Sequence, residues 1–373
     1  MQVKAAVVRA THAPMSLETL DLEDVRDNEI LVRLVATGVC HTDLAMRDQA
    51  FPVPQPIVLG HEGAGVVARI GRAVTKVQAG DHVVMSFNSC GHCPSCNEHE
   101  PTYCHDFFAA NFAGARADGT SPLSKGDERI HGNFFGQSSF ATYSICTERN
   151  IVKVPKDAPL ELLGPLACGV QTGAGAVINA LKPRMGQSLA VFGSGSVGLS
   201  AVMAAKAVGL ATIIAIDLVK ERLTLARALG ATHVIDPSVT PDTVAEIKRI
   251  TGYGVDFSFE TTGVSKVLRQ AVEALAPRGT CGFVGAAALG TEVSLDVMDI
   301  MTQGKTLRGI VEGDSTPDVF IPQMIELHRQ GRFPFDKLVT FYPFERINDA
   351  FNDSESGKVV KPVVRMPGLA PSA

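Results

Sequence analysis

The feature that most constrains the fold is the glycine-rich run Gly193-Ser194-Gly195-Ser196-Val197-Gly198. It follows a short apolar segment, 188–192, that is typical of a buried strand, and it opens a helix-like segment that continues to Gly209. Glycines at the first, third and sixth positions permit a tight turn, a close approach to the backbone, and close helix–strand packing. The run therefore predicts a strand–turn–helix unit.

Strand-like and helix-like segments keep alternating around this run. The strands are continuously apolar, as expected for strands that are buried on both faces. This alternation of strands and helices predicts a doubly wound, mostly parallel sheet over residues 155–307. The expected strands are 188–192, 212–216, 233–235, 255–259 and 279–284, and the expected helices after the first are 219–229, 243–250 and 264–276.

The first 154 residues have a different pattern. Short β-like runs, at 30–34, 65–70 and 82–85, are broken by Gly, Pro and Asp, which indicates a mostly β, barrel-like domain. After 307, a helix at 318–330 and strands at 338–342 and 359–364 are expected to return to this domain. A chain of 373 residues also exceeds the ~250–300 residues of a single core. We therefore expect one domain from 1–154 and 308–373, and another from 155–307.

An acid closes the strand after the glycine run. Asp217 lies 19 residues after Gly198, where its carboxylate could accept hydrogen bonds from a ribose, while the helix N-terminus binds phosphates. A carboxylate there would repel the extra phosphate of NADP, so NAD is the predicted cofactor. Arg222 could help to hold the ribose. The alternative is a structural glycine turn beside a surface Asp. The predicted cofactor-binding residues are Gly193, Gly195, Ser196, Val197, Gly198, Asp217 and Arg222.

Four of the eight cysteines, Cys90, Cys93, Cys96 and Cys104, lie within fifteen residues. A short segment of this kind, 86–106, can wrap a tetrahedral Zn²⁺ with bonds of about 2.3 Å, and a closed shell of four sulfurs makes the metal structural. An iron–sulfur site or two disulfides are the alternatives.

Three further residues carry possible metal ligands. Cys40 lies in the segment 38–43, His61 in 60–63 and Cys168 in 164–169. Taken singly, each has an ordinary structural explanation: a buried small hydrophobic residue for the two cysteines, and a hydrogen-bonded turn residue for the histidine. Sequence spacing alone does not bring them together.

These segments, in this order, resemble the zinc-containing medium-chain alcohol dehydrogenases over nearly the whole chain. The resemblance includes the GHEGAG run at 60–65, the four-cysteine segment, and the glycine run with Asp217. The runs 87–93 and 161–166 more specifically resemble the aryl-alcohol (benzyl alcohol) and geraniol dehydrogenase branch. The resemblance implies a GroES-like, mostly β catalytic domain and a Rossmann cofactor domain.

The resemblance also implies roles for residues near a catalytic zinc. Cys40, His61 and Cys168 would bind it and leave a fourth position open. Glu62 could approach the metal during ligand exchange, and Asp43 would orient His61. Thr42 would accept the alcohol proton, Thr172 would pack against the nicotinamide, and His41 and Lys361 would lie near the pyrophosphate. Several family members have a His five residues after the first zinc Cys. Ala45 stands there in this chain, so the proton route beyond Thr42 stays open.

The implied reaction is oxidation of a primary alcohol to an aldehyde, with hydride transfer to NAD and two Zn²⁺ per subunit. Phe51 and Phe135 are expected to line the substrate cleft, where aromatic walls favour flat or unsaturated substrates. Benzyl-type alcohols are the first expectation. Monoterpene allylic alcohols and aliphatic primary alcohols are the alternatives.

Three other functions fit parts of the pattern less well. A glutathione-dependent formaldehyde dehydrogenase needs cations near the cleft, but in the loop 113–129 the cations Arg116, Lys125 and Arg129 are matched by acids. The ligand set argues against a zinc-free quinone reductase. A non-catalytic protein that uses the fold for binding would leave the open metal position unexplained.

Composition narrows the partners. A net charge of −5 gives no reason to expect nucleic acid, and no apolar run reaches the ~18 residues of a membrane span. The N-terminal segment lacks the apolar core of a signal peptide. We expect a cytoplasmic enzyme that acts on a small alcohol or aldehyde. Family resemblance suggests a homodimer or homotetramer with contacts around Gly279–Leu307.

Overall fold

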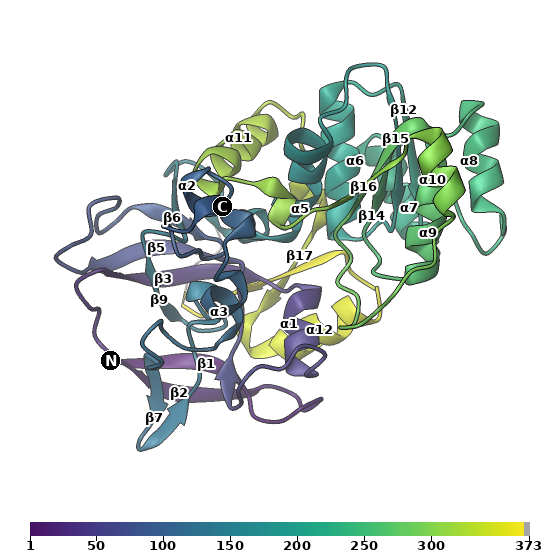
Figure 1. The fold of residues 1–373 in the computed structure, drawn as a ribbon. Coiled ribbons are helices and arrows are strands. Elements are labelled where there is room, and N and C mark those ends of the chain that lie inside the picture. The colour runs from purple at the N-terminus through teal and green to yellow at the C-terminus, as the bar shows by residue number, and fades with distance from the viewer. Residues whose placement is uncertain (369–373) are drawn as a thin grey trace. The chain divides into compact units, whose positions relative to one another are not determined.

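The computed structural model describes residues 1–368, and its contacts divide the chain into two compact units (Figure 1). Unit 1 contains Met1–Cys168, Thr316–Ile325 and the segment that begins at Leu338, while unit 2 contains Gly169–Ser315 and Glu326–Lys337. The fold class expected from the sequence is confirmed: a mostly β domain is combined with a domain built on a parallel sheet.

Unit 2 is built on a six-stranded parallel sheet with the order β13-β12-β11-β14-β15-β16. The strand order reverses between β11 and β14, which is the switch point where doubly wound folds bind their ligands. The strands are β11 (Ser188–Phe192), β12 (Thr212–Ile216), β13 (His233–Ile235), β14 (Val255–Glu260), β15 (Leu275–Phe283) and β16 (Thr306–Gly309).

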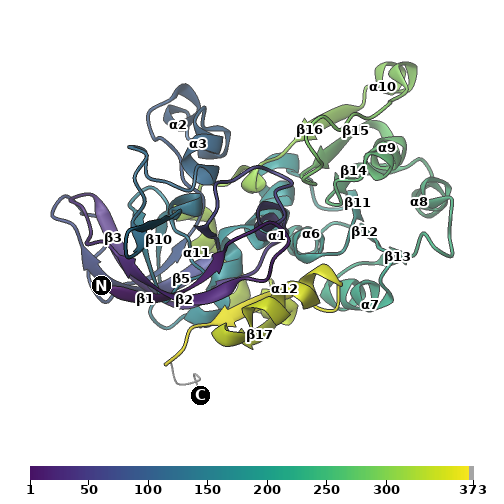
Figure 2. The same ribbon diagram turned by 90° about the horizontal axis from the view of Figure 1, so that it is seen from below.

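Helices cover both faces of this sheet. The helices α6 and α7 pack together on one face, and α8 and α9 pack together on the other (Figure 2). The helices of unit 2 are α5 (Gly169–Gly175), α6 (Ser196–Val208), α7 (Lys220–Leu229), α8 (Thr243–Thr251), α9 (Ser265–Glu273) and α10 (Val297–Gln303). Their amphipathic faces bury the apolar strands, which is why the strands lack the alternation of a half-exposed sheet.

Unit 1 contains two sheets. The five-stranded sheet has the order β4-β1-β2-β7-β8, and the other has the order β10-β6-β5-β3-β18-β17, with β9 also paired to β3. The strands are β1 (Gln2–Val8), β2 (Ser16–Leu22), β3 (Glu29–Gly38), β4 (Ile57–Val58), β5 (Gly63–Ile70), β6 (His82–Met85), β7 (Leu123–Lys125), β8 (Glu128–Ile130), β9 (Tyr143–Thr147), β10 (Ile151–Val154), β17 (Val339–Pro343) and β18 (Lys361–Arg365). The helices are α1 (His41–Arg47), α2 (Pro94–Asn97), α3 (Phe107–Phe112), α4 (Leu160–Leu163), α11 (Pro317–Arg329, which ends in unit 2) and α12 (Ile347–Glu355).

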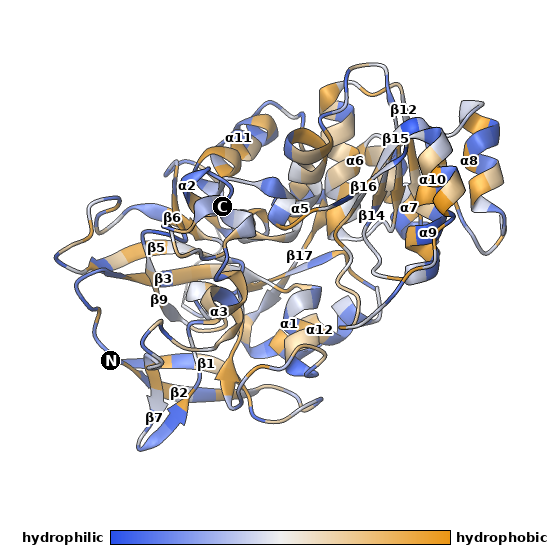
Figure 3. Ribbon diagram, in the orientation of Figure 1, coloured by the Kyte–Doolittle hydropathy of each residue, from blue (hydrophilic) through white to orange (hydrophobic). Residues whose placement is uncertain are grey.

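The long strand β3 organises unit 1. One edge of β3 pairs with β5, and the opposite edge pairs first with β9, over Glu29–Arg33, and then with β18, over Ala36–Gly38. The C-terminal strands therefore return to the N-terminal unit, as the sequence predicts. In Figure 3, β3 and β5 are strongly hydrophobic, whereas the region of β7 is hydrophilic.

The expected domain limits and the observed units differ in the segment 155–168. This segment packs through α4 on β3 and β5, so its contacts belong to unit 1. Residues 308–315 and 326–337 belong to unit 2 by the same measure. Every helix within residues 1–368 is too short or too polar to cross a lipid bilayer.

Candidate active site

Four potential metal ligands meet in unit 1. One donor atom each from Cys40, His61, Glu62 and Cys168 lies within 4.8 Å of the others. The sulfurs of Cys40 and Cys168 are 3.9 Å apart. A tetrahedral metal with bonds of about 2.3 Å to sulfur separates two sulfur ligands by about 3.8 Å. The spacing of the sulfurs therefore fits a shared zinc ion.

Local structure places the first ligand. Cys40 follows the end of β3 and is the N-cap of α1. The carboxylate of Asp43, three residues later, accepts a hydrogen bond from the backbone N–H of Cys40 at 3.0 Å. This capping arrangement satisfies a free donor of the helix N-terminus and fixes the turn that carries the thiol.

Asp43 also holds the second ligand. One carboxylate oxygen of Asp43 lies 2.9 Å from Nδ1 of His61 and accepts a 3.1 Å hydrogen bond from the backbone N–H of Gly60. The Asp43 and His61 side chains are fully buried. The other ring nitrogen of His61, Nε2, is buried and has no hydrogen-bond partner among the described residues. A buried nitrogen without a partner is costly, and a metal ion would satisfy it.

The electrostatics of this cluster favour a cation. The Cys168 sulfur, Lys361 and His61 hold the pKa of the Cys40 thiol well below its usual range. Burial opposes a charge on His61, but the Asp43 carboxylate and the Cys40 sulfur raise the pKa of its ring. Two thiols, the His61 ring and the Glu62 carboxylate thus lie together at one buried centre, so the residues fit a divalent metal ion.

Glu62 is engaged by Lys361. The ammonium of Lys361 lies 2.8 and 3.0 Å from the two carboxylate oxygens of Glu62, and it also donates to the carbonyl of Val39. Burial raises the pKa of Glu62 to about 7, against the attraction of Lys361. Burial opposes the charge on Lys361, but Glu62 and the two cysteines raise its pKa. The expected role of Lys361 at a pyrophosphate stays a prediction; in this structure its ammonium binds Glu62.

The other residues expected near this centre lie on α1. The Oγ1 atom of Thr42 is 3.8 Å from the sulfur of Cys40, so a hydroxyl stands beside the candidate metal position. His41 is the first residue of the helix and is exposed. Ala45 is half-buried and packs on the core of unit 1.

The four-cysteine segment forms a second cluster. The sulfurs of Cys90, Cys93, Cys96 and Cys104 lie within 4.8 Å of one another, and all four cysteines are free of disulfides. Backbone N–H groups of Cys90, Cys93 and His105 donate to three of the sulfurs at 3.2–3.4 Å. Such donors stabilise thiolates, and backbone N–H groups lower the pKa of Cys93 to about 6. The disulfide alternative is therefore wrong for these four residues.

In unit 2, the three glycines of the run have different surroundings. Gly193 has a φ of +95°, which favours glycine in the turn. A Cβ at Gly198 would overlap the carbonyl oxygen of Gly193, because α6 packs closely on the strand. A Cβ at Gly195 would meet nothing within 4 Å. The backbone at Gly195, the N-cap of α6, is therefore open to a ligand such as a phosphate, with Ser196 and Val197 in the first turn.

Asp217 follows β12 beside this loop. Its carboxylate accepts hydrogen bonds from the backbone N–H groups of Ser194, at 2.6 Å, and Val219, at 2.9 Å. Arg222 is half-buried on α7. These contacts fix the acid next to the glycine run, as a ribose-binding acid requires.

Thr172 lies on α5, which begins directly after Cys168. Its hydroxyl donates to the carboxylate of Glu312 at 3.4 Å, and Gln171 donates to the same oxygen at 3.3 Å. Sequence reasoning missed Glu312. Its signal is the neighbouring Gly313, since a Cβ there would overlap the carbonyl of Gln171.

Aromatic rings surround the candidate metal histidine. The ring of Phe135 lies 4.7 Å from that of His61, and Phe134 meets the edge of His61 at 5.8 Å. Phe112, which was not singled out from the sequence, contacts both phenylalanines. Phe51 is half-buried against the core of unit 1. Phe135 thus adjoins the site, while a substrate contact by Phe51 stays a prediction.

A buried glutamine was also missed. Nε2 of Gln137 donates to the carbonyls of His61, Met85 and Ser86, and its Oε1 accepts from the backbone N–H of Gly63. It anchors the turn 60–63 that carries His61 and Glu62. The only signal in the sequence is its place within the run 134–140.

The cations of the loop 113–129 are occupied. Arg116 is buried and pairs with Glu29 and Glu23, and Lys125 pairs with Glu18. Arg129 donates to the carbonyl of Gly119. These contacts give no support to a glutathione site in this loop.

Two protein-family models match most of the chain. Residues 26–156 match the model of the alcohol dehydrogenase GroES-like domain, and residues 196–329 match that of the zinc-binding dehydrogenase. A geraniol dehydrogenase from Castellaniella defragrans is 47% identical over 365 residues, which are 98% of both chains. The chain belongs to the zinc-binding medium-chain alcohol dehydrogenase family.

Solved structures lead to the same branch. A zinc-binding-domain alcohol dehydrogenase from Burkholderia ambifaria is 56% identical, with a TM-score of 0.97 over 98% of this chain and 99% of the other. The benzyl alcohol dehydrogenase of Acinetobacter calcoaceticus is 50% identical, with a TM-score of 0.95 over 98% and 99%. This chain is thus similar both to a geraniol dehydrogenase and to a benzyl alcohol dehydrogenase, the two kinds of enzyme in the predicted branch.

Proposed function

We propose that this enzyme oxidises a primary aromatic or allylic alcohol to the aldehyde, with two zinc ions per subunit and with NAD as the hydride acceptor. The proposal of a catalytic zinc rests on the buried Nε2 of His61, which has no hydrogen-bond partner among the described residues and lies beside the sulfurs of Cys40 and Cys168. When bound, a zinc ion lowers the pKa of an alcohol and a nicotinamide accepts the hydride.

The residues of unit 1 divide the remaining work. Cys40, His61 and Cys168 hold the catalytic zinc, and Asp43 keeps the His61 ring in the orientation that directs Nε2 to the metal. Thr42 accepts the proton of the alcohol on its hydroxyl oxygen and passes its own hydroxyl proton on through the ribose and water, because Ala45 offers no side-chain acceptor. Glu62, held by Lys361, balances charge beside the metal ligands. The four-cysteine cluster binds the second, structural zinc, because its closed sulfur shell leaves no position for substrate.

The residues of unit 2 bind the dinucleotide. The open backbone at Gly195 and the N-terminus of α6 bind the pyrophosphate, and Asp217 accepts hydrogen bonds from the ribose hydroxyls. A carboxylate in this position disfavours the 2′-phosphate of NADP. Thr172 packs against the nicotinamide, and the family resemblance assigns His41 to the pyrophosphate.

Two observations support the substrate class. Phe135 places an aromatic wall beside His61, and aromatic contacts favour flat or unsaturated substrates by about 0.5–1.5 kcal/mol. The similar enzymes named above act on geraniol and on benzyl alcohol. Benzyl-type alcohols are the first candidate, and monoterpene allylic alcohols such as geraniol are the second.

The test measures NADH formation with benzyl alcohol, geraniol and ethanol, together with zinc content per chain. We expect kcat/KM to be highest for benzyl alcohol or geraniol, and a higher value for ethanol would refute the substrate class. Wild type should contain two zinc ions, and Cys40→Ser should contain one and lose turnover. Cys104→Ser should lose the other zinc and melt at a lower temperature. Cys281→Ala, which removes a buried thiol outside both clusters, is the matched control.

A further inference from the structure

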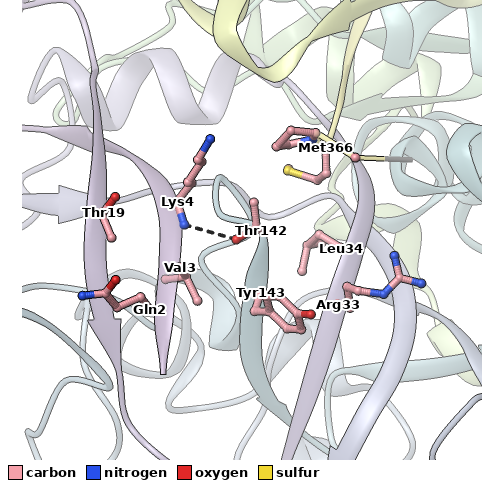
Figure 4. A pocket seen from close by; sticks show the side chains of 11 residues that line it. Gln2, Val3, Lys4, Thr19, Arg33, Leu34, Thr142, Tyr143 and Met366 are labelled. Carbon is pink, nitrogen blue, oxygen red and sulfur yellow. Dashed lines mark hydrogen bonds between the residues drawn. The ribbon is translucent and has the colours of Figure 1, made fainter. Parts of the chain in front are cut away.

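A cleft of about 600 Å³ opens in unit 1 at a place that the proposed function does not use. Figure 4 shows side chains of β1 and β2 on one side of it and those of β3 on the other, with Thr142 and Tyr143 between them. Arg33, on the cleft, and Gly38, at the end of β3 that leads to Cys40, are five residues apart, which is roughly 17 Å along a strand. The cleft is therefore separate from the metal cluster.

The fold creates this cleft where two partners of β3 diverge. β9 pairs with β3 as far as Arg33, and β18 begins its pairing at Ala36. Thr142, just before β9, bridges the two sheets: its carbonyl accepts a hydrogen bond from the backbone N–H of Leu34 at 3.0 Å, and its own N–H donates to the carbonyl of Lys4 at 2.9 Å. A space thus remains between the two sheets, and ladder hydrogen bonds hold its walls.

The two charged side chains that line the cleft are both cations. Lys4 contributes a cation from one sheet and Arg33 contributes a cation from the other, while no acidic residue among 1–368 lines the space. Arg33 is half-buried. Within residues 1–368, neither the ammonium of Lys4 nor the guanidinium of Arg33 has an ion-pair or hydrogen-bond partner. Arg116 of the same unit, by contrast, pairs with two glutamates. A partly desolvated guanidinium gains most from an anionic partner.

The floor of the cleft is apolar. Pro367 lines it with a half-buried ring, whereas Val3, Leu34 and Met366 also border it but are almost fully buried, with exposed fractions of 2%, 1% and 4%. Tyr143 adds a half-buried ring with a hydroxyl group. An inorganic anion would meet the cations but would leave this surface wet, whereas an organic anion would cover it. The volume lies within the ~300–1,000 Å³ of small-molecule sites.

We propose that this cleft is a second binding site, which takes a small organic carboxylate with a compact apolar body. The carboxylate binds Arg33 and Lys4, and the apolar body packs on the half-buried rings of Tyr143 and Pro367. An aromatic acid such as benzoate has this chemistry. The site does not depend on the metal cluster or on the assigned substrate class.

The experiment is a titration of zinc-replete enzyme with 4-fluorobenzoate, followed by fluorine NMR. Because this acid could also reach the metal centre, the titration is repeated in Arg33→Gln, Lys4→Gln and Cys40→Ser. The matched control is Lys156→Gln, which removes an exposed lysine of unit 1 outside the cleft. 4-Fluorobenzamide, which has the same shape without the charge, reports on the need for the carboxylate.

We expect Arg33→Gln to weaken the binding that persists in Cys40→Ser by about tenfold or more, since a charge-assisted contact is lost. Lys4→Gln should weaken it less, and Lys156→Gln should leave it unchanged. Turnover and melting temperature of Arg33→Gln should match wild type, because the residue lies outside the catalytic machinery. The proposal would be overturned if Cys40→Ser did not bind the acid, or if Arg33→Gln left that binding unaffected. It would also be overturned if the benzamide bound as tightly as the acid. Inorganic phosphate that displaces the acid at similar concentration would overturn the requirement for an apolar body.

Discussion

At the scale of single residues, Asp43 is the group on which the candidate catalytic centre most depends. One carboxylate caps the helix that carries Cys40, receives the backbone N–H of Gly60 and orients the ring of His61. We predict that Asp43→Asn lowers zinc affinity at this centre by about 10–100-fold, as is usual when the partner of a metal-binding His is altered. Zinc content after graded chelation is the measurement. One equivalent, at the four-cysteine cluster, should remain. The exposed Asp127→Asn is the control, and equal zinc retention in both variants would contradict the prediction.

The glycines of the run 193–198 differ in what an added methyl group would meet. Gly198→Ala would press a Cβ on the carbonyl of Gly193, whereas the Cβ of Gly195→Ala would enter open space. We expect Gly198→Ala to lower the melting temperature. Gly195→Ala should melt like wild type but bind NAD at least tenfold more weakly, because the methyl group occupies the space of the phosphates. Thermal melting and NAD titration separate the two effects, and tight NAD binding by Gly195→Ala would refute the phosphate position.

Residue identity predicted some of these positions better than others. The glycine run and Asp217 lie close together in sequence, and the structure places them side by side. The four-cysteine cluster also follows from short spacing. Cys40, His61 and Cys168, by contrast, come from three separate turns, and only the family resemblance joined them. Gln137 and Glu312 have only weak local signals, the run 134–140 and the neighbouring Gly313, because their hydrogen bonds reach segments more than 50 residues away.

At the scale of elements, the contact between β17 and α12 predicts a pH effect. The hydroxyl of Tyr342 donates to the carboxylate of Asp353 at 2.6 Å. Burial and this carboxylate raise the pKa of Tyr342 to about 12, whereas an unfolded tyrosine titrates near ~10. The folded state therefore holds the proton more tightly. The contact between Tyr342 and Asp353 contributes fully to the free energy of unfolding below pH ~10. This contribution is lost as the pH rises through about 12.

Tyr342→Phe removes this contribution. We expect a loss of about 1 kcal/mol in the free energy of unfolding at pH 7, and a smaller decrease than in wild type between pH 10 and 12. Urea unfolding at several pH values measures both effects. Tyr253→Phe, at an 82% exposed tyrosine, should leave the alkaline profile unchanged. A Tyr342→Phe profile identical to that of wild type would show that the hydrogen bond adds nothing.

Elements with a strong local pattern were predicted closely. The expected strands 188–192, 212–216 and 233–235 coincide with β11, β12 and β13, because each is a short apolar run between a turn and a helix. The expected strand 30–34 is half of β3, which extends over Glu29–Gly38. The additional residues form a strand because β5 and β18 lie on both sides of them. A tertiary contact of this kind leaves no periodic signal in the sequence.

At the scale of the whole molecule, the two-part organisation was predictable, but the assignment of segments was less so. The change from β-like runs to alternating strands and helices marks the two folds. The segment 155–168 has neither pattern, and only its packing on β3 and β5 assigns it to unit 1. The helix α11 is divided, since residues up to Ile325 belong to unit 1 and those from Glu326 to unit 2. Hydrophobic periodicity cannot locate such a division within one continuous helix.

Unit 2 also has an edge that calls for a partner. β16 is the last strand of its sheet, and three of its four residues are exposed. The preceding helix, α10, is hydrophobic in Figure 3 and exposes Val297, Met298 and Met301 at 74%, 60% and 63%. An open edge strand beside an apolar surface is a template for pairing with another chain. A contact between two copies through β16 and α10 stays a prediction: α10 lies within the region Gly279–Leu307 that the family resemblance suggests, and β16 begins in it.

This contact predicts the mass of the enzyme in solution. Wild type should have a mass of about twice 39.5 kDa, or four times if dimers pair again. Met298→Asp combined with Met301→Asp buries two charges in the contact, so we expect the mass to fall toward that of one chain at micromolar concentration. Met185→Asp, at an 81% exposed methionine outside this surface, is the matched control and should keep the wild-type mass. Light scattering coupled to size-exclusion chromatography measures all three proteins. If the double variant kept the wild-type mass, the contact would lie elsewhere on the chain, and the exposed methionines of α10 would need another explanation.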